Sequence, residues 1–234
     1  MIVSIHQPAY LPWLGYFHRI AKSDLHITLD HVQFEKNSFT NRNKVRTAGG
    51  WLWLTVPVKT KGRFGELRIN HLEIDQANRW REKHWRTIVQ AYSKAPYWKM
   101  HEEFFESTYV REWTLLYELC AHMTGYFLKV LGIRTPLMSS SIMNPAGTKS
   151  ELVLDLCRQT KADTYYSGAL GRAYLNEELF RKKAIRVSYQ DYHHPKYVQF
   201  GQKHFEPYMG IIDLLLNCGP NSLMILMNGQ EAPI

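Results

Sequence analysis

The chain has 234 residues, enough to bury a complete hydrophobic core without help from a metal ion or a disulfide. Its formal net charge of +8 favours an anionic partner, either a nucleic acid or a small phosphate-bearing molecule. The three cysteines are far apart without CxxC spacing, and no apolar run approaches the length of a membrane span, so we expect a soluble cytoplasmic protein with no membrane partner.

The first residues have the pattern of a buried strand followed by a helix. Residues 2–5 form a short apolar run that ends at His6 and Gln7, which is typical of a strand in a parallel sheet. Apolar side chains then recur at spacings of three and four over residues 10–20, which predicts an amphipathic helix with Arg19 toward solvent.

A second strand is predicted over residues 25–29, ending at Asp30. Two strands joined by a helix of this length form a right-handed βαβ unit with parallel strands. Because open α/β sheets bind ligands beyond the carboxyl ends of their strands, we expect His6, Gln7, Asp30 and Gln33 to lie at one pocket.

The segment 31–50 is polar and is predicted to be a loop. It carries Lys36, Asn41 and Arg42, and loops at strand ends are where binding residues gather. These side chains are therefore candidate donors to a negatively charged substrate.

The middle of the chain changes from strand to helix. Residues 51–58 and 67–74 are predicted strands, and 78–132 is predicted to be a mainly helical insertion whose last helical pattern covers 110–131. We expect the whole chain, 1–234, to be a single α/β domain with this insertion inside it.

An alternation of strands and helices resumes after the insertion. We predict strands over 137–142, 162–167 and 184–189, a helix over 148–160, and a final helix from 206 or 207 to 216. Thr148 and Glu151 have the spacing of a capping box. The expected fold is therefore α/β, with a parallel Rossmann-like or HUP-like sheet flanked by helices.

A glycine-bearing turn follows the strand at 162–167 and precedes another predicted helix. Free backbone amides at Ser167 and Gly168 could bind an anion, and Arg172 could hold a phosphate or carboxylate through two parallel hydrogen bonds. The same pattern also fits a plain strand-to-helix turn.

Three residues are candidate catalytic groups. His6 precedes a helix start, where an anion is stabilised, and it could act as a base or charge stabiliser. Asp30 could orient an amine or a ribose hydroxyl, and His193 could supply a base because imidazole titrates near neutral pH. No HExxH or similar spacing occurs, so we expect no metal. The candidate substrate-binding residues are Gln7, Tyr10, Trp13, Gln33, Lys36, Asn41, Arg42, Ser167, Gly168 and Arg172.

Several of these residues lie in motifs that resemble the WbqC family. The motifs are His6-Gln7-Pro8 followed by Leu11-Pro12-Trp13-Leu14-Gly15-Tyr16-Phe17, then Asn41-Arg42, Lys149-Ser150-Glu151-Leu152, Ser167-Gly168 and Ile212-Asp213-Leu214-Leu215-Leu216-Asn217. Members of that family are encoded among genes for bacterial O-antigen and other surface polysaccharides. The resemblance implies a cytoplasmic step in making or decorating an activated sugar.

The order of elements is also similar to the start of nucleotidylyltransferase-type α/β proteins such as pantothenate synthetase. In those proteins an HxGH motif holds ATP phosphates, and a glutamine after the second strand binds the acid that is activated. Gln33 matches that glutamine, but Trp13 and Tyr16 stand where the two histidines would fall.

The leading hypothesis is an enzyme that transfers an acyl or aminoacyl group to the amine of a nucleotide-linked amino sugar, with ATP or acyl-CoA as a candidate cofactor. One alternative is an ATP-dependent ligase or nucleotidylyltransferase-like enzyme that activates a carboxylate. Another is a non-catalytic nucleic-acid-binding or scaffold protein, which is less favoured because the basic residues are spread over several elements. Exposed aromatic residues are compatible with a homodimer.

Overall fold

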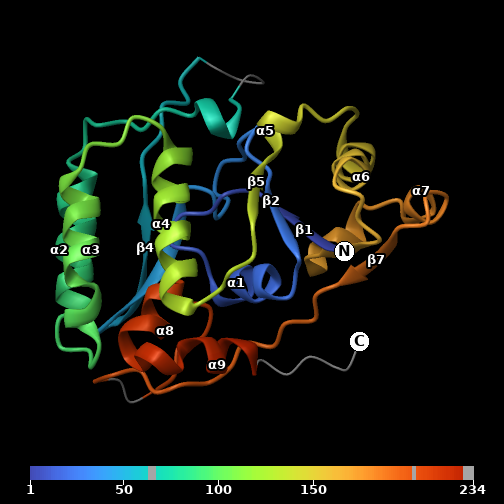
Figure 1. Ribbon diagram of the computed structural model, residues 1–234. Coiled ribbons are helices and arrows are strands. Elements are labelled where there is room, and N and C mark those ends of the chain that lie inside the picture. The colour runs from blue at the N-terminus through green and yellow to red at the C-terminus, as the bar shows by residue number, and fades with distance from the viewer. Residues whose placement is uncertain (63–66, 202–203, 229–234) are drawn as a thin grey trace.

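A five-stranded parallel sheet forms the centre of the protein in the computed structural model, which describes residues 1–62, 67–201 and 204–228 (Figure 1). The spatial order is β5-β2-β1-β6-β7. Numbered along the chain within this sheet, that order is 3-2-1-4-5, which is the Rossmann-like order and confirms the predicted α/β class. The strands are β1 (Ile2–His6), β2 (Leu25–Thr28), β5 (Leu137–Ser139), β6 (Thr164–Ser167) and β7 (Arg186–Tyr189).

The order of strands reverses between β1 and β6. From β1 the chain builds outward through β2 to β5, and it then returns to add β6 and β7 on the other side. The carboxyl ends of the two central strands, His6 and Ser167, therefore lie at a topological switch point, where the crossovers diverge and leave a crevice.

One face of the sheet is covered by α6 (Lys149–Gln159) and α7 (Glu177–Arg181), which flank it in Figure 1. Val3 and Ile5 alternate along β1 toward this side and pack in an apolar cluster with Phe180. This cluster holds the sheet to its outer helices.

The other face of the sheet is polar and lies under α1 (Leu14–Ala21). Ser4 and His26 are fully or almost fully buried there, and the Ser4 hydroxyl lies 2.9 Å from Nδ1 of His26. The prediction that Arg19 points to solvent was wrong: only 3% of this residue is exposed. The reason is that α1 is enclosed on both sides, with Leu14 to Ile20 all buried.

The predicted helical segment contains three helices, and the expected helix over 110–131 is interrupted. Residues 111–115 leave the helical path because Glu73 pairs with Leu115 in a β-bridge and the Trp113 indole donates to a backbone carbonyl at 2.8 Å. The helices are α2 (Trp80–Tyr92), α3 (Trp98–Val110) and α4 (Leu116–Leu131).

The polar segment 31–50 is not all loop. Its second half forms β3 (Arg42–Thr47), which pairs antiparallel with β4 (Gly50–Thr55), the predicted strand at 51–58. The sequence did not predict β3 because one of its inward side chains, Asn43, is polar. The Asn43 amide donates to the Leu11 carbonyl at 2.6 Å. The predicted strand at 67–74 was also wrong, since its centre is a single 3-10 turn, η1 (Ile69–His71), between isolated bridges.

Element ends differ from the prediction at several places. The strand at 137–142 stops at Ser139, and α5 (Ser140–Met143) begins at once because buried Asp30 accepts hydrogen bonds from its first residues. Thr148 precedes α6 without a side-chain cap, so the capping box is not formed. After Gly168 the chain forms η2 (Ala169–Ala173), a 3-10 turn instead of a helix.

The C-terminal helix starts later than predicted and is followed by another. The chain runs through η3 (Gly219–Asn221) between α8 (Ile211–Cys218) and α9 (Ser222–Met227). Residues 207–210 do not join the helix, because Gly210 is tied to the hairpin and to the N-terminal segment: its amide donates to the Lys44 carbonyl at 2.9 Å, and it forms a β-bridge with Trp13. In the described ranges, no helix is both long and apolar enough to cross a membrane.

Candidate functional site

A cleft of about 780 Å³ opens at the switch point of the sheet. The end of β1 contributes His6 and Gln7, the end of β6 contributes Ser167 and Gly168, and α1 contributes Arg19. The cleft thus joins backbone segments that are more than 150 residues apart, as expected where neighbouring crossovers diverge.

His6 is a neutral imidazole at the inner end of the cleft. Its Nδ1 lies 2.7 Å from the Gln7 carbonyl oxygen. Because a carbonyl only accepts, Nδ1 carries the proton and Nε2 keeps its lone pair. Burial and, to a smaller extent, the positive charge of Arg19 together lower the His6 pKa to about 3. The rings of Trp13 and Tyr16 each stand edge-on to this imidazole at 5.3 Å.

Arg19 is the functional candidate that the sequence did not indicate. Its Nε and Nη2 are buried and have no hydrogen-bond partner. Burial lowers the pKa of Arg19, and the hydroxyls of Tyr165, Tyr16 and Tyr166 act in the opposite direction. In the described part of the chain, no carboxylate pairs with this guanidinium.

Gly168 is required by the position of that guanidinium. A Cβ atom at this residue would collide with Nη1 of Arg19. The preceding Ser167 is buried, and its hydroxyl donates to the Gly168 carbonyl at 3.1 Å. The turn after β6 is therefore shaped to let a cation lie against bare backbone.

The mouth of the cleft is aromatic. Trp13 and Phe39 lie 5.1 Å apart between ring centroids, and Tyr192 and Tyr208 line the cleft as well. Phe39 is 44% exposed and Tyr208 is 65% exposed, so both present ring surface to a ligand. Such an entrance suits a molecule that carries a sugar or a planar ring.

Five of the predicted site residues line this one cleft: His6, Gln7, Trp13, Ser167 and Gly168. The sequence indicated these residues because four of them lie at or directly after predicted strand ends, and Trp13 lies in the motif that follows the first predicted strand. The predicted His193 does not line the cleft. It is exposed, and its Nε2 lies 3.6 Å from Oδ1 of Asp191, whereas the neighbouring His194 lines the cleft.

Asp30 does not line the cleft. Its buried carboxylate accepts from the Ser140 hydroxyl at 2.9 Å, from the Ser141 amide at 2.8 Å and from the Ser141 hydroxyl at 2.6 Å. All of these bonds link the end of β2 to the start of α5. The geometry therefore gives Asp30 a connecting position between two elements.

Tyr10 and Asn41 lie in the core. The Tyr10 hydroxyl is 2.8 Å from Nδ1 of His84 and 2.5 Å from the Tyr109 hydroxyl. The Asn41 amide donates to the Val56 carbonyl at 2.9 Å. The Tyr10 hydroxyl and the Asn41 amide nitrogen are therefore occupied by the protein itself.

The remaining predicted binding residues do not line the cleft either. The Arg42 guanidinium donates to the Asn37 carbonyl at 2.6 Å, which ties it to its own loop. The Arg172 guanidinium lies over the Tyr189 ring, 4.2 Å from its centroid. The remaining predicted substrate-binding residues that do not line the cleft are Gln33, Lys36, Arg42 and Arg172.

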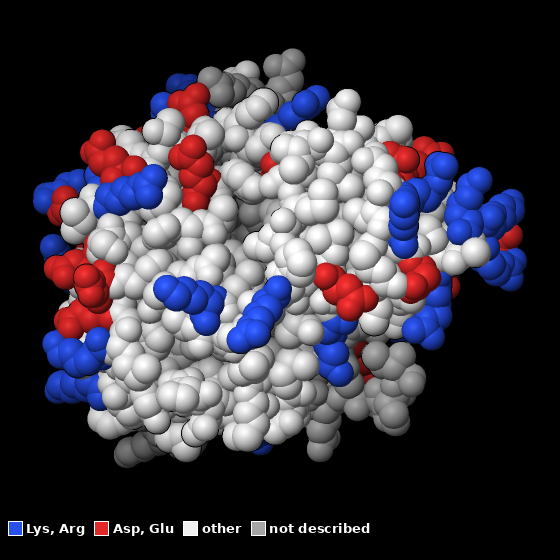
Figure 2. All heavy atoms as spheres, viewed as in Figure 1, with Lys and Arg blue, Asp and Glu red and all other residues white. Residues whose placement is uncertain are grey.

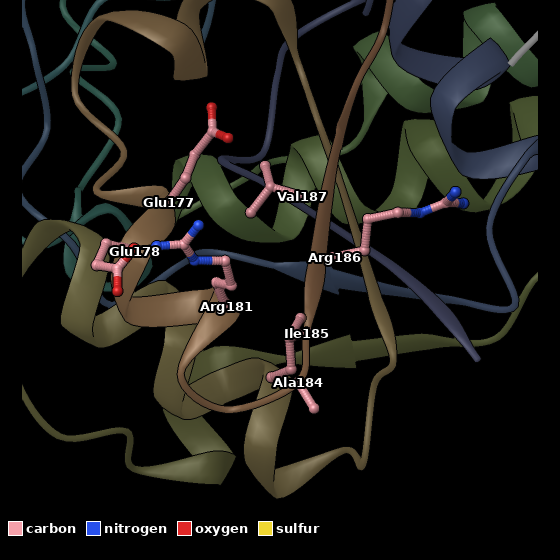
Figure 3. Close-up of a pocket in the computed structure, with 7 residues that line it drawn as sticks. All are labelled: Glu177, Glu178, Arg181, Ala184, Ile185, Arg186 and Val187. Atoms are coloured by element: carbon pink, nitrogen blue, oxygen red, sulfur yellow. Dashed lines mark hydrogen bonds and ion pairs between the residues drawn. The ribbon is translucent and has the colours of Figure 1, made fainter.

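A second hollow of about 500 Å³ lies between α7 and β7 (Figure 3). Three of its charged side chains already have partners, since Arg181 pairs with Glu178, and Glu177 accepts from the Tyr189 hydroxyl at 2.7 Å. It also lies at the amino end of β7, where Arg186 begins the strand. Parallel sheets bind ligands at the opposite end, so this hollow is the weaker candidate.

Within residues 1–62, 67–201 and 204–228, no group of three or more His, Cys, Asp or Glu side chains is arranged to hold a metal ion.

Comparison with known proteins identifies relatives along nearly the whole chain. Residues 7–225 match the model of the WbqC-like protein family. A protein of Mycobacterium tuberculosis (strain ATCC 25618 / H37Rv), named uncharacterized protein Rv1507c, is 36% identical over 218 residues, which cover 93% of this chain and 94% of that relative. No solved structure matches the chain.

Proposed function

Because the chain belongs to the WbqC-like protein family, we propose that it is an enzyme of bacterial surface-polysaccharide biosynthesis that transfers an acyl or aminoacyl group to the amine of a nucleotide-linked amino sugar. The observation that carries the proposal is the cleft at the switch point, where His6 and the turn at Ser167 and Gly168 meet. Sites of small-molecule enzymes are found at this position in α/β sheets.

The size and lining of the cleft support a substrate with a ring at one end and a negative charge at the other. A volume of about 780 Å³ lies within the ordinary range for small-molecule sites. Aromatic side chains surround the mouth, while Arg19 lies at the inner wall. A nucleotide-linked sugar has both of these features.

The transfer step uses the lone pair of His6. The amine nitrogen of the sugar attacks the carbonyl carbon of an acyl-CoA thioester, so that an N–C bond forms and the C–S bond breaks. Neutral His6 accepts a hydrogen bond from the amine at Nε2 and so orients the amine, and the proton that the nitrogen loses leaves with the sulfur as a free thiol. An aminoacyl group enters by the same step when its carboxylate has first been activated, for example with ATP.

The distribution of charge gives less support to a nucleic-acid-binding protein. On the face shown in Figure 2, Lys and Arg side chains are interleaved with Asp and Glu near the margins, and they do not form a continuous basic track. Electrostatic binding to a polyanion requires cations gathered on one surface.

The test is an assay in which nucleotide-linked amino sugars are incubated with acyl-CoA, or with amino acid and ATP, and products are identified by mass spectrometry. We expect one combination to give an N-acylated sugar, and His6→Gln to lower kcat by a factor of about 100, because the amine is no longer held in position. The exposed His71→Gln is the matched control and should retain activity. Product formation by the His6 variant at the wild-type rate, or no product from any combination, would contradict the proposal.

A further inference from the structure

The guanidinium of Arg19 is a buried charge with two donors unused. The residue is 3% exposed, lines the cleft, and leaves Nε and Nη2 without a hydrogen-bond partner. A buried charge without a counter-ion destabilises a protein strongly, because desolvation is not offset by an ion pair. A side chain in this state therefore indicates that its partner is supplied from outside the chain.

The neighbours of Arg19 cannot supply that partner. The hydroxyls around it belong to Tyr165, Tyr16, Tyr166 and Tyr174, and tyrosine hydroxyls are neutral at physiological pH. They provide polar surroundings without a compensating charge. The cleft side of Arg19 is the remaining direction from which an anion can approach.

The backbone next to Arg19 is adapted to keep the guanidinium at the cleft wall. Gly168 has no side chain, and a Cβ atom there would displace Nη1 of Arg19. The same turn contributes Ser167 and Gly168 to the cleft lining. A ligand that contacts this turn is therefore beside the guanidinium.

We propose that Arg19 is the receptor for a phosphate group of the substrate. A guanidinium donates two parallel hydrogen bonds to a phosphate, and Nε and Nη2 are adjacent donors of the kind that such a bidentate contact uses. Phosphate is favoured over a carboxylate because the aromatic mouth formed by Trp13, Phe39 and Tyr208 suits the ring of a nucleotide. This inference rests on the proposed function, since it takes the same cleft as the substrate site.

A structural role and an anion-binding role for Arg19 predict different melting temperatures for variants of the ligand-free protein. If the guanidinium stabilises the fold, its removal lowers the melting temperature. If its function is to bind an anion, its replacement by a neutral side chain leaves the melting temperature equal or higher, because a desolvated charge is removed.

The experiment measures melting temperature and calorimetric binding for wild type, Arg19→Gln and Arg19→Met. The probes are pyrophosphate, UDP and ADP, with uridine and malonate as probes that lack phosphate. We expect the phosphate probes to stabilise and bind the wild type, and both variants to bind them about ten- to a hundredfold more weakly. Arg158→Gln on the exposed face of α6 removes the same charge and should bind as the wild type does.

A second variant tests the placement of the guanidinium without changing any charge. Gly168→Ala forces Nη1 of Arg19 to move, so phosphate probes should bind at least tenfold more weakly. Gly125→Ala is the matched control, because no atom lies within 4 Å of a Cβ built there. It should leave binding unchanged.

The inference would be overturned if no phosphate probe bound the wild type. It would also be overturned if the Arg19 variants bound the phosphate probes as well as the wild type does, or if both variants failed to fold. Tighter binding of malonate than of pyrophosphate would replace phosphate by carboxylate and would also overturn it. Phosphate binding that depends on Arg19, in a protein that transfers no acyl group, would leave this inference standing and remove the proposed reaction.

Discussion

At the scale of single residues, the position of Arg19 helps to explain the state of His6. Burial and the Arg19 charge both lower the His6 pKa, so the imidazole is neutral and its Nε2 lone pair is available at physiological pH. A protonated ring beside an unpaired guanidinium would place two like charges in one buried site. The pair is therefore arranged to hold one positive charge and one acceptor.

Buried histidines also predict how stability depends on pH. Burial lowers the pKa of His84 to about 4, against 6.5 in an unfolded chain. The unfolded chain therefore binds the proton more readily, so stability is complete above about pH 6.5 and falls as the pH drops toward 4. At pH 5 the loss from this residue is about 2 kcal/mol.

Urea unfolding at pH 7.5 and pH 5 measures this dependence. In His84→Gln the loss between the two pH values should be smaller than in the wild type by about 2 kcal/mol. His71→Gln, with an exposed ring, controls for the removal of a histidine. An unchanged difference between the two pH values in His84→Gln would show that His84 is protonated equally in both states.

The residues at strand ends could be predicted from the sequence, and Arg19 could not. His6, Gln7, Ser167 and Gly168 follow apolar runs that stop abruptly, and this pattern is local. The burial of Arg19 depends on cover from parts of the chain that follow much later. The one local signal is that the helix from Leu14 to Ala21 has almost no polar side for solvent.

At the scale of elements, Asp30 joins β2 to α5. Its carboxylate accepts from Ser140 and Ser141, the first residues of the helix that follows β5. Asp30→Asn removes one acceptor oxygen from a buried site, so the free energy of unfolding should fall by about 1–3 kcal/mol in urea titrations. Asp191→Asn, on the surface, is the control. If unfolding were unchanged and activity lost, the catalytic role predicted for Asp30 from the sequence would be favoured.

β1 and β2 were predictable because each is a short, mainly apolar run between polar segments, and β6 and β7 because they contain tyrosine and valine, which favour strands. β3 escaped prediction because it belongs to a separate hairpin whose inward Asn43 is satisfied by a distant carbonyl. The segment at 67–74 resembles a strand in composition, yet its partners are single residues such as Gln33 and Leu115. Tertiary pairing decided both cases, and it cannot be read from local pattern.

At the scale of the whole molecule, the cleft lies between the sheet and the elements that cover α1. Residues from the N-terminal loop, from the turn after β6 and from the segment between β7 and α8 all reach it. The hairpin contributes Lys44, whose ammonium lies 4.0 Å from the centroid of the Trp51 ring. A substrate in this cleft would therefore contact the sheet, α1, α6 and the hairpin, whereas no residue of α2 to α4 or of α7 to α9 lines it.

The most direct measurement is a crystal structure of the protein with a bound nucleotide-linked amino sugar. We predict electron density for the ligand between His6 and Ser167, with a phosphate at Arg19 and the sugar amine within hydrogen-bonding reach of Nε2 of His6. Ligand density elsewhere, for example in the hollow between α7 and β7, with the cleft filled only by solvent, would contradict the account.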